Sequence, residues 1–201
     1  MSSNAPGRQR PIGRGEKVRK AILAATLSEL GRTGYAALTV ENVASAAGVH
    51  KTTVYRRWDD RNSLIVDALG DQIAQDIPIP DTGSFEADLR ALARAFVGWA
   101  TSDSGQAILA AMLSDAVRVP EIAEARQRIF EGRVRMAAGV IGRAIEREEV
   151  PADTDPEEVI KCLVAPLYLR LLITGEELDA TAADRAVTVT VTAVRAGILG
   201  R

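Results

Sequence analysis

The sequence predicts an all-α protein of about nine helices, in which an N-terminal three-helix unit is joined to a larger C-terminal helical domain. Three observations support this fold class. Apolar residues recur at three- and four-residue steps along most of the chain, which is the spacing of one face of a helix. Segments that contain glycine and proline separate these stretches. A chain of 201 residues with 47% hydrophobic residues can bury one core, or the cores of a small and a larger unit.

The first helix follows residues 1–15, whose Pro, Gly, Ser and Arg without apolar periodicity predict a flexible basic arm. From Glu16 onward apolar residues recur at helical steps and predict a helix that ends near Gly31 to Gly34. Thr39 can then cap a second helix, because its hydroxyl can accept a free backbone N–H of the first turn.

A glycine turn follows the second helix, which Gly48 should end. After it Val49 is expected to be buried, and His50 or Lys51 begins a short third helix that ends near Trp58. Helix, glycine turn and helix form the helix-turn-helix pattern, which we place at residues 16–58.

Residues 59–80 predict a connecting helix, which Asp59 and Asp60 can cap. It should close at IPIPDTGS, residues 77–84, where prolines and a glycine predict a domain boundary. Residues 84–201 predict five further helices, with breaks at TSDSG (101–105), RVP (118–120), VPADTDP (150–156) and TGEELD (174–179). The stretch AVTVTVTAV (186–194) alternates as a strand would, but we predict a helix, because a lone strand would leave its backbone groups unpaired.

The composition argues against several kinds of site. The chain has one cysteine, Cys162, and one histidine, His50, so we expect no disulfide framework, no metal site and no cofactor. An enzyme is disfavoured, because the chain has neither a Gly-rich phosphate loop nor a nucleophile elbow. No apolar run approaches the roughly 18 residues of a membrane span, so we expect a cytoplasmic protein without a membrane partner.

Charge is divided unevenly along the chain. Residues 1–58 hold ten Lys and Arg against three Glu, a net charge of +7, so that a total of -2 leaves -9 for the remainder. A basic N-terminal segment followed by an acidic remainder indicates that the N-terminal end binds a polyanion.

The predicted third helix carries chemistry that suits DNA. With about 100° of rotation per residue, Val54 and Trp58 share an inward face with Val49. The outward residues are Lys51, Thr52, Tyr55 and Arg56, with Thr53 near the flank. Hydroxyl, aromatic and cationic groups on a short helix can enter the major groove and reach bases and phosphates. The N–H groups at the start of that helix can also meet a phosphate.

The stretch LTVENVASAAGVHKTTVYRRWDDRNSLIVDAL resembles the DNA-binding domain of the TetR family of bacterial transcriptional regulators. The matching positions are Thr39, Ala44 to Val49, Tyr55, Trp58, Arg61 and Leu64. The resemblance implies that phosphates are held by Thr39, Tyr55 and Arg61. It implies that Lys51, Thr52 and Thr53 lie at or beside base edges. His50, which stands where many members have serine, and Arg56 complete the candidate DNA-binding residues.

The resemblance also implies a homodimer and an unknown small-molecule effector for the C-terminal domain, in which APLYLRLLITGEELD resembles a penultimate helix of the family. Candidate residues for a largely apolar effector pocket are Phe96, Trp99, Leu109, Met112, Phe130 and Tyr168. Candidate residues for the dimer interface are Leu163, Leu167, Leu171, Val187, Val191, Val194 and Ile198. The alternatives are that the aromatic residues form core and that the apolar stripes pack only within one chain.

The sequence therefore predicts a ligand-responsive repressor that binds a palindromic DNA operator as a dimer. Three alternatives stay open: a DNA-binding protein without an effector, a ligand-binding dimer that has lost DNA binding, and, with least support, an enzyme.

Overall fold

The computed structural model describes residues 13–114 and 120–200, with all side chains in these ranges except those of Arg14 and residues 111–114. Within these ranges the chain forms nine α-helices, one π-helical turn and no strand, which confirms the predicted fold class. None of the described helices is long and apolar enough to cross a membrane. The chain divides into two compact units, one ending at Ala68 and the other beginning at Leu69.

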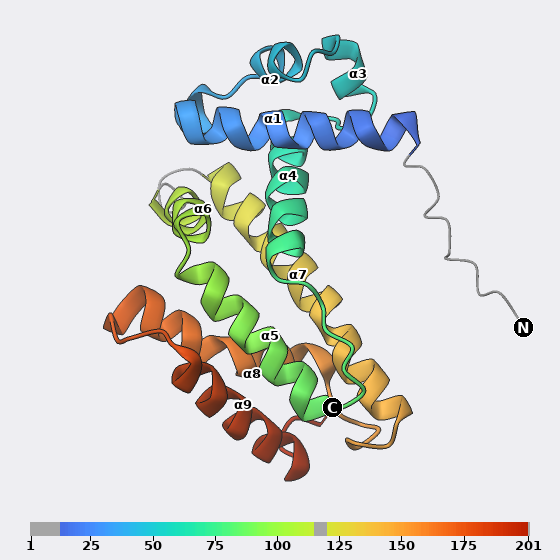
Figure 1. The fold of residues 1–201 in the computed structure, drawn as a ribbon, viewed down its shortest axis with the longest axis vertical. Helices are drawn as coiled ribbons and strands as arrows, with labels where there is room; N and C mark the ends of the chain where they lie inside the picture. Colours follow the sequence, from blue (N-terminus) through green and yellow to red (C-terminus); the bar gives the residue numbers. More distant parts are fainter. Residues whose placement is uncertain (1–12, 115–119, 201) are drawn as a thin grey trace, which may run out of the picture. The chain divides into compact units, whose positions relative to one another are not determined.

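The N-terminal unit contains α1 (Arg14–Ala37), α2 (Val40–Ala46), α3 (Lys51–Tyr55) and the first half of α4 (Arg61–Asp76). Figure 1 shows α2 and α3 on the same side of α1. Helix α1 begins inside the stretch expected to be a flexible arm. The carbonyl oxygen of Gly13 accepts hydrogen bonds from the backbone N–H groups of Glu16 and Lys17, which form the first turn of the helix. Residues 1–12 of that stretch lie outside the described residues. The backbone leaves helical geometry at Gly34, with φ 76°, near the predicted end of the helix.

Asp67 on α4 joins three parts of this unit. Its carboxylate accepts two hydrogen bonds from Arg19 Nη2 on α1, at 2.9 and 3.1 Å, and one from Trp58 Nε1 at 3.0 Å. Trp58 is 7% exposed and follows α3, with the buried Val54 one helical turn before it. Asp60 caps α4, as predicted, because its carboxylate accepts the N–H of Ser63 at 2.6 Å. The end of α3 is thereby fixed to both α1 and α4.

The C-terminal unit contains the second half of α4 and the five further helices that the sequence predicts. These are α5 (Phe85–Ala100), α6 (Asp103–Ser114), α7 (Pro120–Glu146), α8 (Pro156–Leu169) and α9 (Ala180–Arg195). Helix α5 packs on α9, and α8 packs on both α7 and α9 (Figure 1). Beyond Pro166, which lies inside α8, the helix widens into the π turn Arg170–Thr174 and ends at Gly175 with φ 64°.

The valine- and threonine-rich stretch 186–194 is helical, as predicted. The hydroxyls of Thr188, Thr190 and Thr192 donate to carbonyl oxygens one turn earlier in the same helix, at 2.7 to 2.9 Å. These bonds satisfy the hydroxyls within a helix that is continuous from Ala180 to Arg195. The valine side chains at positions 187, 191 and 194 are buried, so packing against neighbouring helices outweighs their strand propensity.

The link between α4 and α5 belongs to the C-terminal unit, although the sequence places a domain boundary at residues 77–84. Side chains of α5 and α7 hold its backbone. Arg133 Nη2 donates to the carbonyl oxygen of Ile77 at 2.7 Å, and Arg143 Nη2 donates to that of Pro80. The buried Asp88 accepts the N–H and the hydroxyl of Thr82 at 2.6 and 2.7 Å. The two units therefore divide inside α4 rather than at the prolines.

Candidate functional site

The turn between α2 and α3 has a single well-defined geometry. Gly48 adopts φ 66°, a left-handed conformation that glycine reaches without a side-chain clash. Its N–H donates to the carbonyl oxygen of Ser45 at 3.1 Å, and the N–H of Val49 donates to that of Ala44 at 2.9 Å. This pair of bonds is the Schellman motif, which satisfies the last carbonyls of α2 and directs the chain into α3.

Val49 is half-buried rather than buried, so this detail of the prediction is wrong. Its backbone N–H closes the turn, which places its side chain at the edge of the core. The inward face of α3 is instead formed by Val54, which is 1% exposed, and is continued by Trp58.

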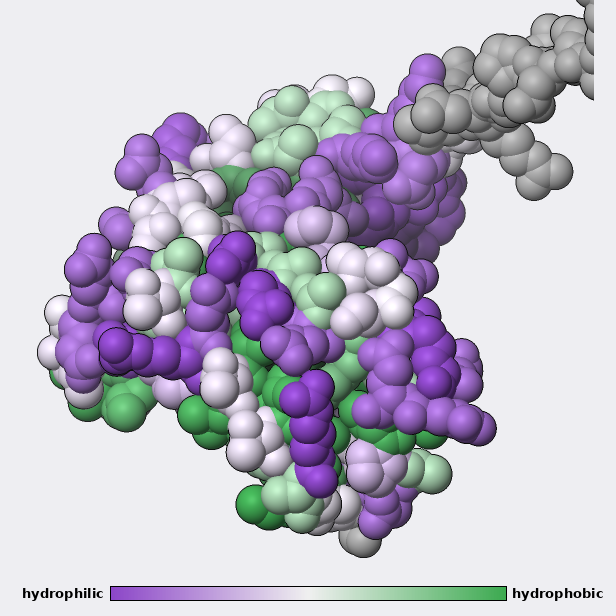
Figure 2. All heavy atoms as spheres, turned by 60° about the horizontal axis from the view of Figure 1, so that its bottom comes forward, coloured by the Kyte–Doolittle hydropathy of each residue, from purple (hydrophilic) through white to green (hydrophobic). Residues whose placement is uncertain are grey.

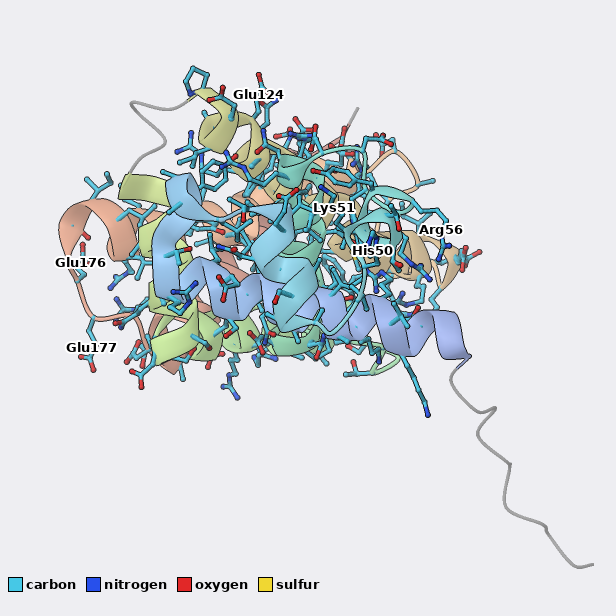
Figure 3. All side chains as sticks on the ribbon, turned by 90° about the horizontal axis from the view of Figure 1, so that it is seen from above. His50, Lys51, Arg56, Glu124, Glu176 and Glu177 are labelled. Atoms are coloured by element: carbon cyan, nitrogen blue, oxygen red, sulfur yellow. The ribbon has the colours of Figure 1, made fainter. Side chains whose placement is uncertain are left out.

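The opposite face of α3 carries the residues that the sequence assigns to DNA. The exposed side chains are those of Lys51, Thr52, Tyr55 and Arg56, and Thr53 is half-buried at the flank. Tyr55, a large aromatic residue, is 47% exposed. Figure 3 shows His50, Lys51 and Arg56 grouped at this helix. The predicted outward and inward faces of α3 are therefore both present.

Three side chains near the start of α3 contact one another or α2. His50 precedes the helix without capping it through its side chain, and its Nδ1 lies 3.0 Å from Thr52 Oγ1. Lys51 Nζ lies 3.5 Å from Glu41 Oε1 in an exposed pair. Such a pair contributes little to stability, so a phosphate can replace the carboxylate as the partner of Lys51 at small cost.

The last predicted phosphate residues lie where α1 meets α2. Thr39 Oγ1 caps α2 by accepting the N–H of Asn42 at 3.2 Å, which confirms the predicted cap. The guanidinium of Arg61 lies 4.9 Å from the ring centre of Tyr35, and its Nη1 is 3.4 Å from the carbonyl oxygens of Ala36 and Leu38. Arg61 therefore has a structural role at this junction, and a guanidinium with five N–H groups retains donors for a phosphate.

Arg57 is turned toward the protein. Its Nη2 donates to the carbonyl oxygen of Gly15 at 2.9 Å and joins the end of α3 to the start of α1. Helical spacing alone does not indicate this orientation, because the partner is 42 residues away.

A second candidate site is a cavity of about 540 Å³ inside the C-terminal unit. Of the residues predicted to line a pocket, those that line this cavity are Phe96, Trp99, Leu109, Phe130 and Tyr168. The side chain of the sixth, Met112, lies outside the described residues. The ring of Phe96 lies 6.0 Å from that of Trp99 and 4.9 Å from that of Tyr168, between ring centres. Burial raises the pKa of Tyr168 to about 12, so its phenol is protonated at neutral pH.

Sequence reasoning missed other residues of this wall, among them Ile73, Ile77, Leu92, Arg133, Ile160 and Val164. Most are aliphatic residues on helical stripes, which resemble ordinary core in a sequence. Arg133 had a detectable signal: it lies four residues after the buried Ile129 and four before the buried Ala137, and so interrupts an apolar stripe of α7.

The predicted dimer residues separate into two groups. The side chains of Leu163, Leu167, Val187, Val191 and Val194 are buried within the single chain, which corrects their assignment to an interface. The reason is that α8 packs between α7 and α9, and α9 also packs on α5. Leu171 is half-buried, and Ile198 is 71% exposed. Figure 2, which brings the side of α8 and α9 forward, shows hydrophobic side chains at the surface among hydrophilic ones.

Comparisons with known proteins match both units. A family model described as "Bacterial regulatory proteins, tetR family" matches residues 22–68. A second, described as "Tetracyclin repressor-like, C-terminal domain", matches residues 79–190.

Individual relatives cover most of the chain. The uncharacterized HTH-type transcriptional regulator YdeS of Bacillus subtilis (strain 168) is 33% identical over 83% of this chain and 84% of its own length. The DNA-binding transcriptional repressor TetR of Mycobacteroides abscessus is 30% identical over 84% of this chain and 90% of its own length. The crystal structure of the TetR family transcription regulator SCO0332 has a TM-score of 0.72 and 32% identity, over 89% of this chain and 99% of that chain. The chain therefore belongs to the TetR family of bacterial transcriptional regulators.

Proposed function

We propose that the chain is a ligand-responsive repressor that acts in the bacterial cytoplasm, binds a palindromic operator as a homodimer and is released by a small, largely apolar effector. The observation that carries this proposal is the outward face of α3, where cationic, hydroxyl and aromatic side chains are exposed while Val54 is buried. Family membership supports a non-enzymatic, DNA-binding regulator. The relative from Mycobacteroides abscessus, which is named a repressor, supports repression.

DNA is contacted by both ends of the helix-turn-helix in this proposal. Thr39, His50, Tyr55 and Arg61 hold phosphates and set the position of the unit on the duplex. Lys51, Thr52 and Arg56 enter the major groove, with the half-buried Thr53 beside them. The Lys51 ammonium exchanges its exposed contact with Glu41 for the DNA.

Two such units are needed to read a whole operator, and a dimer places two recognition helices about 34 to 36 Å apart. The surface we propose for the dimer is the exposed side of α8, the π turn and α9, because their inward stripes are already covered within the chain. The apolar side chains exposed there are Leu169, Leu172, Ile173, Val189 and Ile198. Apolar patches of this kind are typical of protein interfaces.

The effector is proposed to occupy the cavity of the C-terminal unit. Its volume of about 540 Å³ falls within the range of small-molecule sites, and its walls are mostly aromatic and aliphatic. An effector releases DNA only if it binds a dimer conformation that the operator does not favour. Ile73 in α4 and Ile77 directly after it contribute to the cavity wall, and α4 begins in the DNA-binding unit. Helix α4 therefore contributes residues both to the cavity wall and to the DNA-binding unit.

The proposal is tested by selecting bound sequences from a random pool of duplexes at near-physiological salt. We expect an inverted repeat whose half-sites are centred about one helical turn apart. The selected duplex should bind about a thousandfold or more tightly than random duplexes. Recovery of sequences with no repeat, bound no more tightly than the starting pool, would instead indicate an architectural DNA-binding protein.

Two substitutions on α3 separate the roles of its residues. Thr52→Ala is expected to change which bases are preferred at particular operator positions, by about 1 to 3 kcal/mol at those positions, because it removes a group at a base edge. Tyr55→Phe is expected to weaken binding to all duplexes by a similar factor, because it removes a phosphate contact. Repeating the selection and measuring affinities with both variants checks this. Equal losses on every sequence for both variants would contradict the assignment.

A further inference from the structure

Two residues that line the cavity of the C-terminal unit each carry a buried hydrogen-bond donor without an acceptor among the described residues. Nη1 of Arg133 is buried and has no hydrogen-bond partner among the described residues, whereas Nη2 of the same group donates to Ile77. Nε1 of Trp99 is likewise buried and without a partner there. Both side chains line the cavity. Because nearly all buried polar groups in folded proteins are hydrogen-bonded, these two donors indicate a ligand that supplies acceptors.

The charge of the cavity has a single sign. Among the lining residues that the structure describes, the charged ones are Arg126 and Arg133, and none is Asp or Glu. Burial lowers the pKa of Arg133, because apolar surroundings disfavour the charged form, and the nearby Tyr168 offsets part of this effect. An arginine nevertheless stays charged in proteins at neutral pH. The cavity therefore holds a partly buried positive charge.

The types of hydrogen-bond donor in the site restrict the chemical class of the ligand. Guanidinium and indole N–H groups donate hydrogen bonds and cannot accept them, so the ligand must carry acceptors at these points. A carboxylate is the acceptor that a guanidinium binds most strongly, through charge-assisted hydrogen bonds. A cationic ligand would add a like charge beside Arg126 and Arg133, which is unfavourable in surroundings of low polarity.

The aromatic residues of the cavity wall require a ligand with an apolar part. Neighbouring rings run from Trp99 through Phe96 and Tyr168 to Phe130, with 6.2 Å between the last two ring centres. Arg133 lines the same cavity as these four rings. The apolar rings and the guanidinium thus belong to one continuous site, and a matching ligand has a charged group attached to an apolar part.

We propose that this cavity binds an amphipathic organic acid, whose carboxylate accepts from Arg133 Nη1 and whose aliphatic or aromatic body lies against the rings of Phe96, Phe130 and Tyr168. The indole N–H of Trp99 is a second donor for an acceptor of the same ligand. This inference rests on the proposed ligand response and names the chemical class of the effector. It also places the ligand carboxylate next to Arg133, whose guanidinium donates to the carbonyl oxygen of Ile77 directly after α4.

The inference is tested by calorimetric titration of the purified full-length protein at pH 7.5 with pairs of matched probes. Octanoate is compared with octanamide, 2-naphthoate with 2-naphthamide, and octylammonium provides the opposite charge. At least one acid is expected to bind at least about tenfold more tightly than its amide, as a charge-assisted contact implies. Binding of octanoate alone identifies an aliphatic body, and binding of 2-naphthoate alone an aromatic one.

Variants of two arginines of α7, one that lines the cavity and one that does not, assign the contact. Arg133→Met is expected to weaken binding of the acid at least tenfold and of its amide less than threefold. Arg128→Met, which removes an exposed arginine of α7 that does not line the cavity, is the matched control and should change both by less than threefold. If Arg133→Met does not fold, as judged by thermal unfolding, Arg133→Gln replaces it, because its amide can still donate to Ile77 while the charge is lost.

Equal affinity for acid and amide, or tighter binding of octylammonium, would overturn the inference. A preference for acids that survives in the Arg133 variants would also overturn it, as would no binding of either acid at millimolar concentration. Parallel titrations with the selected operator distinguish this from a failure of the proposed function. Acid binding through Arg133 that leaves operator affinity unchanged supports the inference and contradicts ligand-responsive regulation. Release by a neutral compound, without acid binding, contradicts the inference alone.

Discussion

Replacing Trp58 with alanine is expected to lower the free energy of unfolding of the DNA-binding unit by about 3 to 5 kcal/mol, the usual cost of truncating a buried aromatic side chain. Trp58 is 7% exposed, and its Nε1 donates to Asp67. The substitution leaves a cavity at the end of α3. It also removes the hydrogen bond that the Asp67 carboxylate accepts from the indole N–H. A unit of this size has little stability to spare, so duplex binding should weaken at least about tenfold.

The measurement is urea denaturation followed by far-ultraviolet circular dichroism, with hydrogen exchange of peptides from residues 22–68 to localise the effect. Trp58→Phe is the matched control, because it keeps a six-membered ring in the core while it removes the N–H donor and the smaller ring of the indole. It should cost about 1 to 2 kcal/mol. An alanine variant with unchanged exchange in this region would show that Trp58 does not hold α3 in place.

Reversing two charges on α3 is expected to have the largest effect on DNA binding itself. The double variant Lys51→Glu and Arg56→Glu should bind every duplex at least about a hundredfold more weakly at physiological salt, because it replaces two attractions to phosphate by two repulsions in each subunit. The dependence of affinity on salt should also become shallower, since fewer counterions are released. Fluorescence anisotropy with labelled duplexes at several salt concentrations measures both quantities.

The control for this variant is Arg128→Glu with Arg135→Glu, two exposed arginines on α7. It changes the net charge of the protein by the same amount, away from α3. The control should retain most of the affinity and the salt dependence of the natural sequence. Equal losses in both double variants would mean that total charge, rather than the face of α3, governs binding.

The helix-turn-helix was predictable from local sequence because its signals act over a few residues. A threonine cap, a glycine that permits φ 66°, and the spacing of Val54 and Trp58 specify the start of α2, the turn and the inward face of α3. The same reasoning identified the helical breaks within residues 101–105, 150–156 and 174–179 and the helix through residues 186–194. Residues 118 and 119 of the break predicted at 118–120 lie outside the described residues. The outward side chains of α3 follow directly, since a short helix with one buried face exposes the other.

The partners of each face could not be predicted in this way, because they come from distant parts of the chain. A stripe such as Leu163 and Leu167 indicates that one side of a helix is buried, but not whether a neighbouring helix or a second subunit covers it. Here α7 and α9 of the same chain cover α8. Arg133 illustrates the same limit, since the carbonyl oxygen to which it donates belongs to Ile77, 56 residues earlier in the chain. Periodicity specifies a buried face one helix at a time, whereas the packing of distant helices decides what buries it and where a cavity is left.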